Sequence, residues 1–160
     1  MLALAILTIL LAFAFTFTNG FQDASSIAAT FIASRSATPK TGILLIAVMS
    51  FFGTMLGGSA VAFTLAGLVS VRSGPQELVI IFAALGTATA WNLVTGRIGM
   101  PASSTHSLVG GLVGAGIAAA GTGSILWGTG DLLGPAHEVT GIVKIILFFF
   151  LSLLIGFAGS

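Results

Sequence analysis

The carboxylate of Asp23 is the side chain whose setting in this sequence most strongly indicates chemistry. It stands in a short polar stretch, Asn19–Ser26, and the stretches on either side, 2–17 and 27–32, carry no charge. A carboxylate at bilayer depth costs several kcal/mol, so it usually persists because it holds an ion, a proton or a substrate. We therefore expect Asp23 to bind a cation; the structural alternative is an ion pair with a distant arginine.

A second polar stretch, Gly99–Ser107, has chemistry suited to an anion. Pro101 fits the first turn of a new helix, and Ser103, Ser104 and Thr105 carry short hydroxyl groups that can cap this helix or face a ligand. A helix start presents free N–H groups and a partial positive charge, which favour an anion. Single hydroxyls in membrane helices usually bond back to the backbone, but five hydrogen-bonding side chains in succession favour a binding site.

The composition places both stretches in a membrane. Hydrophobic residues make up 56% of the chain and charged residues only 6%, which is too little polar surface to cover a water-soluble protein. The net charge is +1 without a basic cluster, so nucleic acid is not expected as a partner. Cysteine is absent, which excludes disulfides and thiolate metal sites. The expected surroundings are a lipid bilayer.

The helices that must position these side chains follow from the apolar stretches, which occupy 2–34, 41–71, 78–95, 99–120 and 139–158. A helix needs about 20 residues to cross a hydrocarbon core of about 30 Å, so the sequence predicts an all-α integral membrane protein with about five transmembrane helices. We expect discontinuous or re-entrant segments: interruptions at Asn19-Gly20 and Gly57-Gly58, where glycine permits a turn, and a break at Pro101.

The basic connectors predict the orientation. Arg35 and Lys40 lie in the first connector and Arg97 in the third, whereas the connector around Asp131 and Glu138 has no Lys or Arg. We expect the basic connectors to face the cytoplasm, as is usual for proteins of the cell membrane. The N-terminus of the chain then lies outside the cell and the C-terminus lies inside.

An odd number of crossings would place a second copy of this unit upside down relative to the first. Transporters are commonly built from such inverted repeats, with the substrate site near the midplane where the repeats meet. No repeat occurs within the chain, so we expect residues 1–160 to form a single membrane-embedded repeat unit, one half of a larger inverted-repeat transporter. The second inverted half would be continued in the same chain or supplied by a second copy in a homodimer.

Together the two polar stretches resemble the signatures of the PiT family of inorganic phosphate transporters. The first signature matches Asn19-Gly20-Phe21-Gln22-Asp23-Ala24-Ser25-Ser26 and the later Ser34-Arg35-Ser36-Ala37-Thr38-Pro39, and the second is similar to the stretch from Gly99 to Gly116. Gln22 and Ser26 depart from the pattern, since the family usually has Asn or His at the first of these positions and Asn at the second. The motifs follow the family order, and the likeness extends over nearly the whole chain.

The resemblance implies cation-coupled symport of inorganic phosphate by alternating access, with sodium ions or protons as coupling ions and no other cofactor. The implied phosphate-binding residues are Ser103, Ser104, Thr105 and His106. The implied cation-binding residues are Asn19, Gln22, Asp23 and Ser26, and Asp23 would hold the metal ion if the coupling ion is sodium. The family also implies two inverted halves, each with an aspartate-containing signature.

Two other functions remain open, and a third, a membrane protease, is disfavoured. Sulfate is a tetrahedral oxyanion of similar size, and the chain could instead be a non-transporting half that assembles with a second repeat. Gly128-Thr129-Gly130-Asp131 resembles a motif of membrane aspartyl proteases, but Asp131 lies in the connector most exposed to water. Ser104 and His106 are too close in sequence to share one helical face as a dyad. We therefore expect no enzyme.

Several single residues have ordinary structural explanations. Gly110, Gly114 and Gly116 are expected to allow close helix packing. Trp91 is expected to anchor the third helix at the membrane interface. For His106, a packed polar residue and a proton carrier are equally open.

Overall fold

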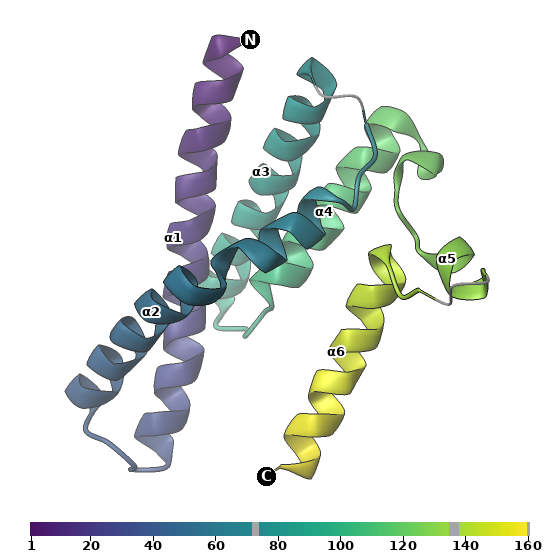
Figure 1. Cartoon of the computed structure of the whole chain (residues 1–160). Helices are drawn as coiled ribbons and strands as arrows, with labels where there is room; N and C mark the ends of the chain where they lie inside the picture. The colour runs from purple at the N-terminus through teal and green to yellow at the C-terminus, as the bar shows by residue number, and fades with distance from the viewer. Residues whose placement is uncertain (72–73, 135–137, 160) are drawn as a thin grey trace.

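The structure, a computed structural model, describes residues 1–71, 74–134 and 138–159, and its regular elements are helices (Figure 1). In chain order they are α1 (Leu2–Ala33), α2 (Pro39–Ala66), α3 (Pro75–Ile98), α4 (Ser104–Ala120), the 3-10 helix η1 (Thr122–Ser124), α5 (Thr129–Leu133) and α6 (Gly141–Ala158). Over the described ranges, β pairing is limited to one antiparallel bridge between Val69 and Ile125. The predicted all-α class is confirmed.

The polar stretch of α1 does not interrupt the helix. α1 runs through Asn19-Gly20 and α2 runs through Gly57-Gly58, so both predicted interruptions are wrong. A glycine inside a helix costs only about 1 kcal/mol relative to alanine. Opening a helix in lipid leaves backbone groups without hydrogen bonds, and each such group costs several kcal/mol. The continuous helix is therefore favoured.

The predicted break near Pro101 is present, as the connection between α3 and α4. α3 ends at Ile98 and is capped by Gly99, whose φ of 70° lies in the left-handed region that glycine adopts without strain. α4 begins at Ser104, and the backbone N–H of His106 donates to the Oγ of the capping residue Ser103 over 3.4 Å. Proline, which lacks a backbone N–H, lies outside both helices.

Four helices are long and apolar enough to cross a membrane in the part of the chain that the structure describes: α1, the Pro39–Gly57 part of α2, α3 and α6. α4 has 17 residues and so extends about 26 Å, short of a hydrocarbon core of about 30 Å. The first residues of the fourth predicted apolar stretch, 99–120, belong to the connection between α3 and α4 and not to α4 itself. The structure thus has four long apolar helices and one shorter apolar helix, α4, where the sequence predicted about five transmembrane helices.

α3 is the central helix. In the most apolar part of α3, 39% of the residues are buried, against 6% in α1 and α6. α1 runs parallel to α3, because Leu11 packs against Gly86 and, further along both helices, Gln22 contacts Thr95. α4 returns antiparallel beside α3, and the two chain termini lie at opposite ends of the molecule (Figure 1).

Close packing in the α3–α4 hairpin depends on Gly111. A Cβ atom at this position would lie 2.8 Å from the carbonyl oxygen of Ala84, so any larger residue forces the two helices apart. Gly116, also predicted to allow close helix packing, is instead packed against the connectors, since its Cβ would lie 2.8 Å from the side chain of Ile125 and 3.1 Å from that of Val69. The prediction is wrong for Gly110 and Gly114, which face open space.

Candidate functional site

The connection between α3 and α4 lies against the polar stretch of α1. The side-chain amide Nε2 of Gln22 donates to Thr95 Oγ1 over 2.7 Å, between buried residues 73 positions apart in the sequence. Thr95 Oγ1 itself donates to the carbonyl oxygen of Trp91 over 2.9 Å, so it acts as the acceptor toward Gln22. The cavity beside this bond has a volume of about 400 Å³, and its walls include Gln22, Ser25, Ser26, Gly99, Met100 and Pro101. The two polar stretches of the sequence are therefore neighbours in space.

Asp23 faces α2 instead. Asn19 and Asp23, one helical turn apart on the same face of α1, line a cavity of about 680 Å³ between α1 and α2. Ser50 and Thr54 of α2 line the same cavity. The Asp23 side chain is exposed on this face, so it is accessible to a ligand from the space between the two helices.

The four residues predicted to bind a cation thus lie on two adjacent faces of α1. Asn19 and Asp23 face α2, whereas Gln22 and Ser26 line the cavity beside the α3–α4 connection. The hydroxyl of Ser26 also donates to the backbone carbonyl oxygen of Gln22 over 3.1 Å. The structure brings these residues together as two pairs and not as one ring of ligands.

The four residues predicted to bind phosphate point in different directions around the start of α4. Ser103 and His106 line a cavity of about 800 Å³ together with Trp91. Ser104 is buried, with 4% of its surface exposed. Thr105 lines a separate cavity between α2, α4 and α6. The structure therefore joins Ser103 and His106 in one cavity and places the other two residues apart from them.

His106 has an aromatic neighbour on α6. Its ring packs edge-on against Phe149, with ring centroids 4.8 Å apart. Trp91, predicted as an interfacial anchor, is 54% exposed and lines the same cavity as His106. This cavity therefore combines a histidine, hydroxyl groups and an indole ring.

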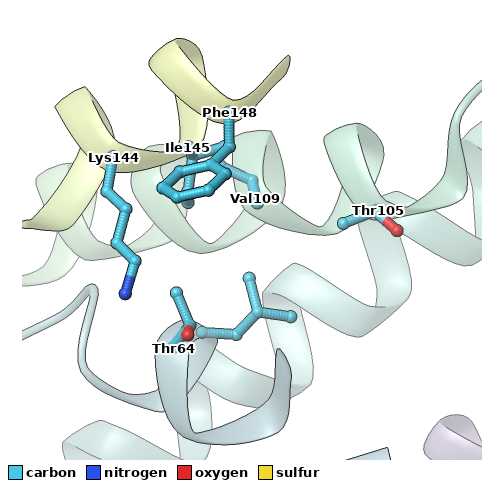
Figure 2. Close-up of a pocket in the computed structure, with 7 residues that line it drawn as sticks. Thr64, Thr105, Val109, Lys144, Ile145 and Phe148 are labelled. Carbon is cyan, nitrogen blue, oxygen red and sulfur yellow. The ribbon is translucent and has the colours of Figure 1, made fainter. Parts of the chain in front are cut away.

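Lys144 belongs to the cavity that Thr105 lines, and sequence reasoning missed it. Figure 2 shows its side chain extending from α6 toward the end of α2 that carries Thr64, with Thr105 of α4 on another side of the cavity. The cavity has a volume of about 300 Å³. The signal in the sequence was a single charge inside the apolar stretch 139–158.

Sequence reasoning also gave no role to two buried polar residues of α3. Asn92 is 3% exposed and Thr89 is 8% exposed, and they lie three residues apart on the helix. Asn92 lines a cavity of about 340 Å³ together with Gln22. The available signal was an amide and a hydroxyl at helical spacing in an otherwise apolar segment.

The residues considered for enzyme chemistry do not form a catalytic pair. Asp131 lies in the short helix α5, is exposed, and accepts a hydrogen bond from the Thr140 hydroxyl. Ser104 is buried, whereas His106 lines the cavity with Trp91, so their side chains diverge.

Comparison with known proteins decides the family. Residues 19–160 match the family model described as "PHO4: Phosphate transporter family". The chain belongs to the phosphate transporter family. This confirms the resemblance seen in the two polar stretches, and it sets the chain among transporters and not enzymes.

The family relatives include several inorganic phosphate transporters. A "Probable low-affinity inorganic phosphate transporter" of Mycobacterium bovis is 39% identical over 160 residues, which cover 99% of this chain and 36% of that protein. A protein of the same name from Streptomyces halstedii is 37% identical over 158 residues, covering 98% and 68% of the two chains. The "Low-affinity inorganic phosphate transporter PitB" of Escherichia coli is 31% identical over 159 residues, covering 94% and 31%.

The chain thus spans 36% of the length of the Mycobacterium bovis relative. No solved structure matches it.

Proposed function

We propose that this chain forms part of a transporter that carries inorganic phosphate across a cell membrane together with sodium ions or protons, by alternating access. The observation that carries the proposal is that the polar stretch of α1 and the α3–α4 connection line one cavity, beside the bond from Gln22 to Thr95 of α3. The proximity of the two polar stretches supports the binding of a cation and an oxyanion near each other, since side-chain oxygens suit a cation and a helix start suits an anion. The names of the relatives support inorganic phosphate as that oxyanion.

Phosphate transport against a membrane potential needs cations. Near neutral pH, phosphate carries between one and two negative charges, and each charge costs about 2.3 kcal/mol per 100 mV to bring into a negative cytoplasm. Two sodium ions only cancel the charge of a dianion. Accumulation therefore draws on the sodium concentration gradient, on a third cation, or on protons.

In this proposal Asp23 binds the cation. Like charges repel strongly in a low-dielectric site, so an ionised Asp23 does not bind a phosphate oxygen directly. Asn19, in the same cavity, lends a neutral oxygen to the cation. Gln22 and Ser26, on the adjacent face of α1, lie between this cavity and the α3–α4 connection, where a second cation contact would bring positive charge close to the phosphate.

In the same proposal the start of α4 binds the phosphate. Its free N–H groups supply hydrogen-bond donors, and so do the side chains of Ser103 and His106, which share one cavity, and of Thr105, which lines another. Lys144 adds a positive charge to the cavity that Thr105 lines, which supports an anion there. In a cavity walled largely by apolar side chains such as Val109 and Phe148, this charge acts over a longer range than in water.

A second, inverted half completes the transporter, either continued in the same chain or contributed by a second copy. The N-terminus lies outside the cell and the C-terminus inside, as the distribution of Arg35, Lys40 and Arg97 predicts. The substrate passes between the two halves, near the midplane of the membrane.

Uptake by reconstituted protein tests the proposal. The purified protein is incorporated into liposomes, and labelled phosphate is followed with an inward sodium gradient, an inward proton gradient, or no gradient. We expect uptake above that of protein-free liposomes with at least one gradient. Equal uptake with and without both gradients would contradict cation coupling. No uptake by correctly inserted protein would contradict transport by this chain and would instead indicate a half that acts only with another half.

Competition identifies the substrate in the same assay. Excess unlabelled phosphate should suppress the uptake of labelled phosphate, whereas equal sulfate should leave most of it. Stronger suppression by sulfate than by phosphate would assign the chain to sulfate.

A further inference from the structure

Arg97 shares a cavity with a buried amide and with exposed aromatic rings, and the proposed phosphate path does not use it. The cavity has a volume of about 340 Å³ and lies between α1 and α3. Its walls include Phe17 and Phe21 of α1 and Asn92 of α3. Within the described ranges, no ion pair or hydrogen bond engages the Arg97 side chain. An exposed, unpaired cation therefore borders a largely apolar cavity.

The length of α3 places Arg97 at a membrane surface. Glu77 in the first turn and Arg97 in the last turn are the two charged residues of this helix. They lie 20 positions apart, which corresponds to about 30 Å along the helix axis. A hydrocarbon core is also about 30 Å thick, and long charged side chains extend toward the headgroups. The guanidinium group of Arg97 therefore lies at the level of lipid headgroups.

The aromatic rings of α1 continue from this level into the membrane. α1 and α3 run parallel, and Gln22 contacts Thr95, so Phe21 lies close to the level of Arg97. Phe17 lies one helical turn deeper on the same face of α1, and both rings are exposed. A cation at the surface with apolar rings below it matches the phosphate and the acyl chains of a phospholipid.

Asn92 supplies a hydrogen-bond donor at an intermediate depth. It precedes Arg97 by five residues, about 7.5 Å along the helix axis. It is 3% exposed, and its Nδ2 has no hydrogen-bond partner among the described residues. Buried donors in native proteins are nearly always satisfied, so this amide indicates a bound acceptor. The ester carbonyl groups of a phospholipid are such acceptors, and they lie just below its phosphate.

Two features oppose an anion deep in this cavity. The buried amide oxygens Asn92 Oδ1 and Gln22 Oε1 also lack partners in the described part of the chain, and they would repel a phosphate beside them. The carboxylate of Asp23 would repel it too, but it faces the other cavity, between α1 and α2. The phosphate therefore belongs at Arg97, and the neutral ester group belongs at Asn92.

We propose that the cavity between α1 and α3 binds an anionic phospholipid of the surrounding bilayer. Its phosphate binds Arg97, an ester carbonyl accepts from Asn92 Nδ2, and an acyl chain lies along Phe21 and Phe17. Arginine suits this group because its planar guanidinium donates two parallel hydrogen bonds to a phosphate. Basic pockets between membrane helices are known to bind anionic headgroups. A zwitterionic lipid fits less well, since Arg97 repels the ammonium group of its headgroup.

Lipid-dependent stability tests the site. A ligand that binds only the folded protein raises its unfolding temperature. The purified protein is unfolded thermally in detergent micelles with increasing mole fractions of phosphatidylglycerol, or of phosphatidylcholine with the same acyl chains. We expect half-maximal stabilisation at a several-fold lower mole fraction of phosphatidylglycerol. The same response to both lipids would overturn the proposal of an anionic lipid site.

Arg97→Gln assigns the phosphate contact. It should raise the half-saturating mole fraction of phosphatidylglycerol about tenfold, as expected for the loss of a charge-assisted hydrogen bond, and should remove the preference over phosphatidylcholine. Lys40→Gln is the matched control, because it removes another exposed cation, in the first turn of α2. This control should keep the preference. An equal loss in both variants would show a general attraction by net charge and refute the site.

An ether-linked phosphatidylglycerol, which lacks ester carbonyl groups, tests Asn92. The unmutated protein should bind this lipid several-fold more weakly than the ester lipid, whereas Asn92→Leu should bind the two lipids equally. If Asn92→Leu does not fold, the comparison of the two lipids on the unmutated protein decides. Equal binding of both lipids to the unmutated protein would refute the contact with Asn92.

Inorganic phosphate distinguishes a lipid headgroup from the free ion. Millimolar phosphate should leave the half-saturating mole fraction of phosphatidylglycerol unchanged, because the free ion has no acyl chain to place along the rings of α1. Competition by phosphate that Arg97→Gln abolishes would assign Arg97 to the free ion and overturn the lipid site. Uptake enters none of these measurements, so a failure of the proposed function and a failure of this site are distinguishable.

Discussion

The amide of Gln22 donates to the hydroxyl of Thr95 over 2.7 Å and so joins the polar stretch of α1 to the last turns of α3. Both side chains are buried, and their helices run parallel at this point. The bond fixes the position along α1 beside which the α3–α4 connection lies. It therefore links the first signature stretch to the helix that leads into the second.

This bond should be measurable as a coupling energy. A double-mutant cycle with Gln22→Leu and Thr95→Val should give an interaction of about 1 kcal/mol in the free energy of unfolding, the usual size of a buried hydrogen bond in a membrane protein. Thermal or denaturant unfolding in detergent supplies the measurement. A cycle of Gln22→Leu with Thr30→Val, whose hydroxyl bonds within its own helix, should give no coupling. Equal coupling in both cycles would show that the bond is not specific.

Asp23→Asn should abolish cation-coupled phosphate uptake while the protein still folds and inserts. The substitution keeps the size of the side chain but removes the negative charge that attracts the cation in the cavity between α1 and α2. Uptake into liposomes should fall to the level of protein-free liposomes. Glu77→Gln removes a carboxylate in the first turn of α3 and should retain uptake. Normal uptake by Asp23→Asn would contradict the role given to Asp23.

Lys144→Gln should raise the phosphate concentration needed for half-maximal uptake several-fold, with a smaller effect on the maximal rate. The reason is that the ammonium group attracts phosphate into the cavity that Thr105 lines. Lys144→Arg, which keeps the charge, should restore most of the affinity. Lys40→Gln, in the first turn of α2, is the matched control. The same loss in both glutamine variants would argue for a general effect of net charge.

Gly111→Ala should destabilise the protein by about 1–3 kcal/mol, the usual cost of overpacking. The added Cβ would lie 2.8 Å from the carbonyl oxygen of Ala84, which belongs to the backbone and has no rotamer to relieve the clash. Gly110→Ala, one residue earlier and facing open space, should be neutral or slightly stabilising. Thermal unfolding of the two variants provides the comparison, and equal stability would contradict the close contact.

The helices could largely be predicted from the sequence, because the length of an apolar run determines whether it crosses a membrane. The stretch 139–158 corresponds to α6 at Gly141–Ala158, and 2–34 corresponds to α1 at Leu2–Ala33. The interruption predicted at Asn19-Gly20 is absent, because the low helix propensity of glycine costs less free energy than leaving backbone groups unpaired in lipid. The predicted start of α4 was wrong, because a run of apolar and small residues does not show that the helix begins only after Pro101 and Ser103.

The candidate site was predictable in its residue types but not in its geometry. Two side chains next to each other on a helix, such as Gln22 and Asp23, differ by about 100° in direction. Which neighbour each one meets depends on how α2 and α3 pack against α1, and the sequence pattern does not contain that information. Asn92 and Lys144 lie outside the signature stretches, so only their polarity within apolar segments marked them.

The fit of Gly111 against Ala84 has a mechanical consequence. α3 and α4 touch backbone to backbone at this point, and near their far ends the side chain of Gln76 donates to Ala119 O over 2.8 Å. These two contacts oppose sliding of one helix along the other. We therefore expect α3 and α4 to move as one rigid unit, so that a displacement of the connector after α4 also displaces Pro101 at the other end of the helix pair.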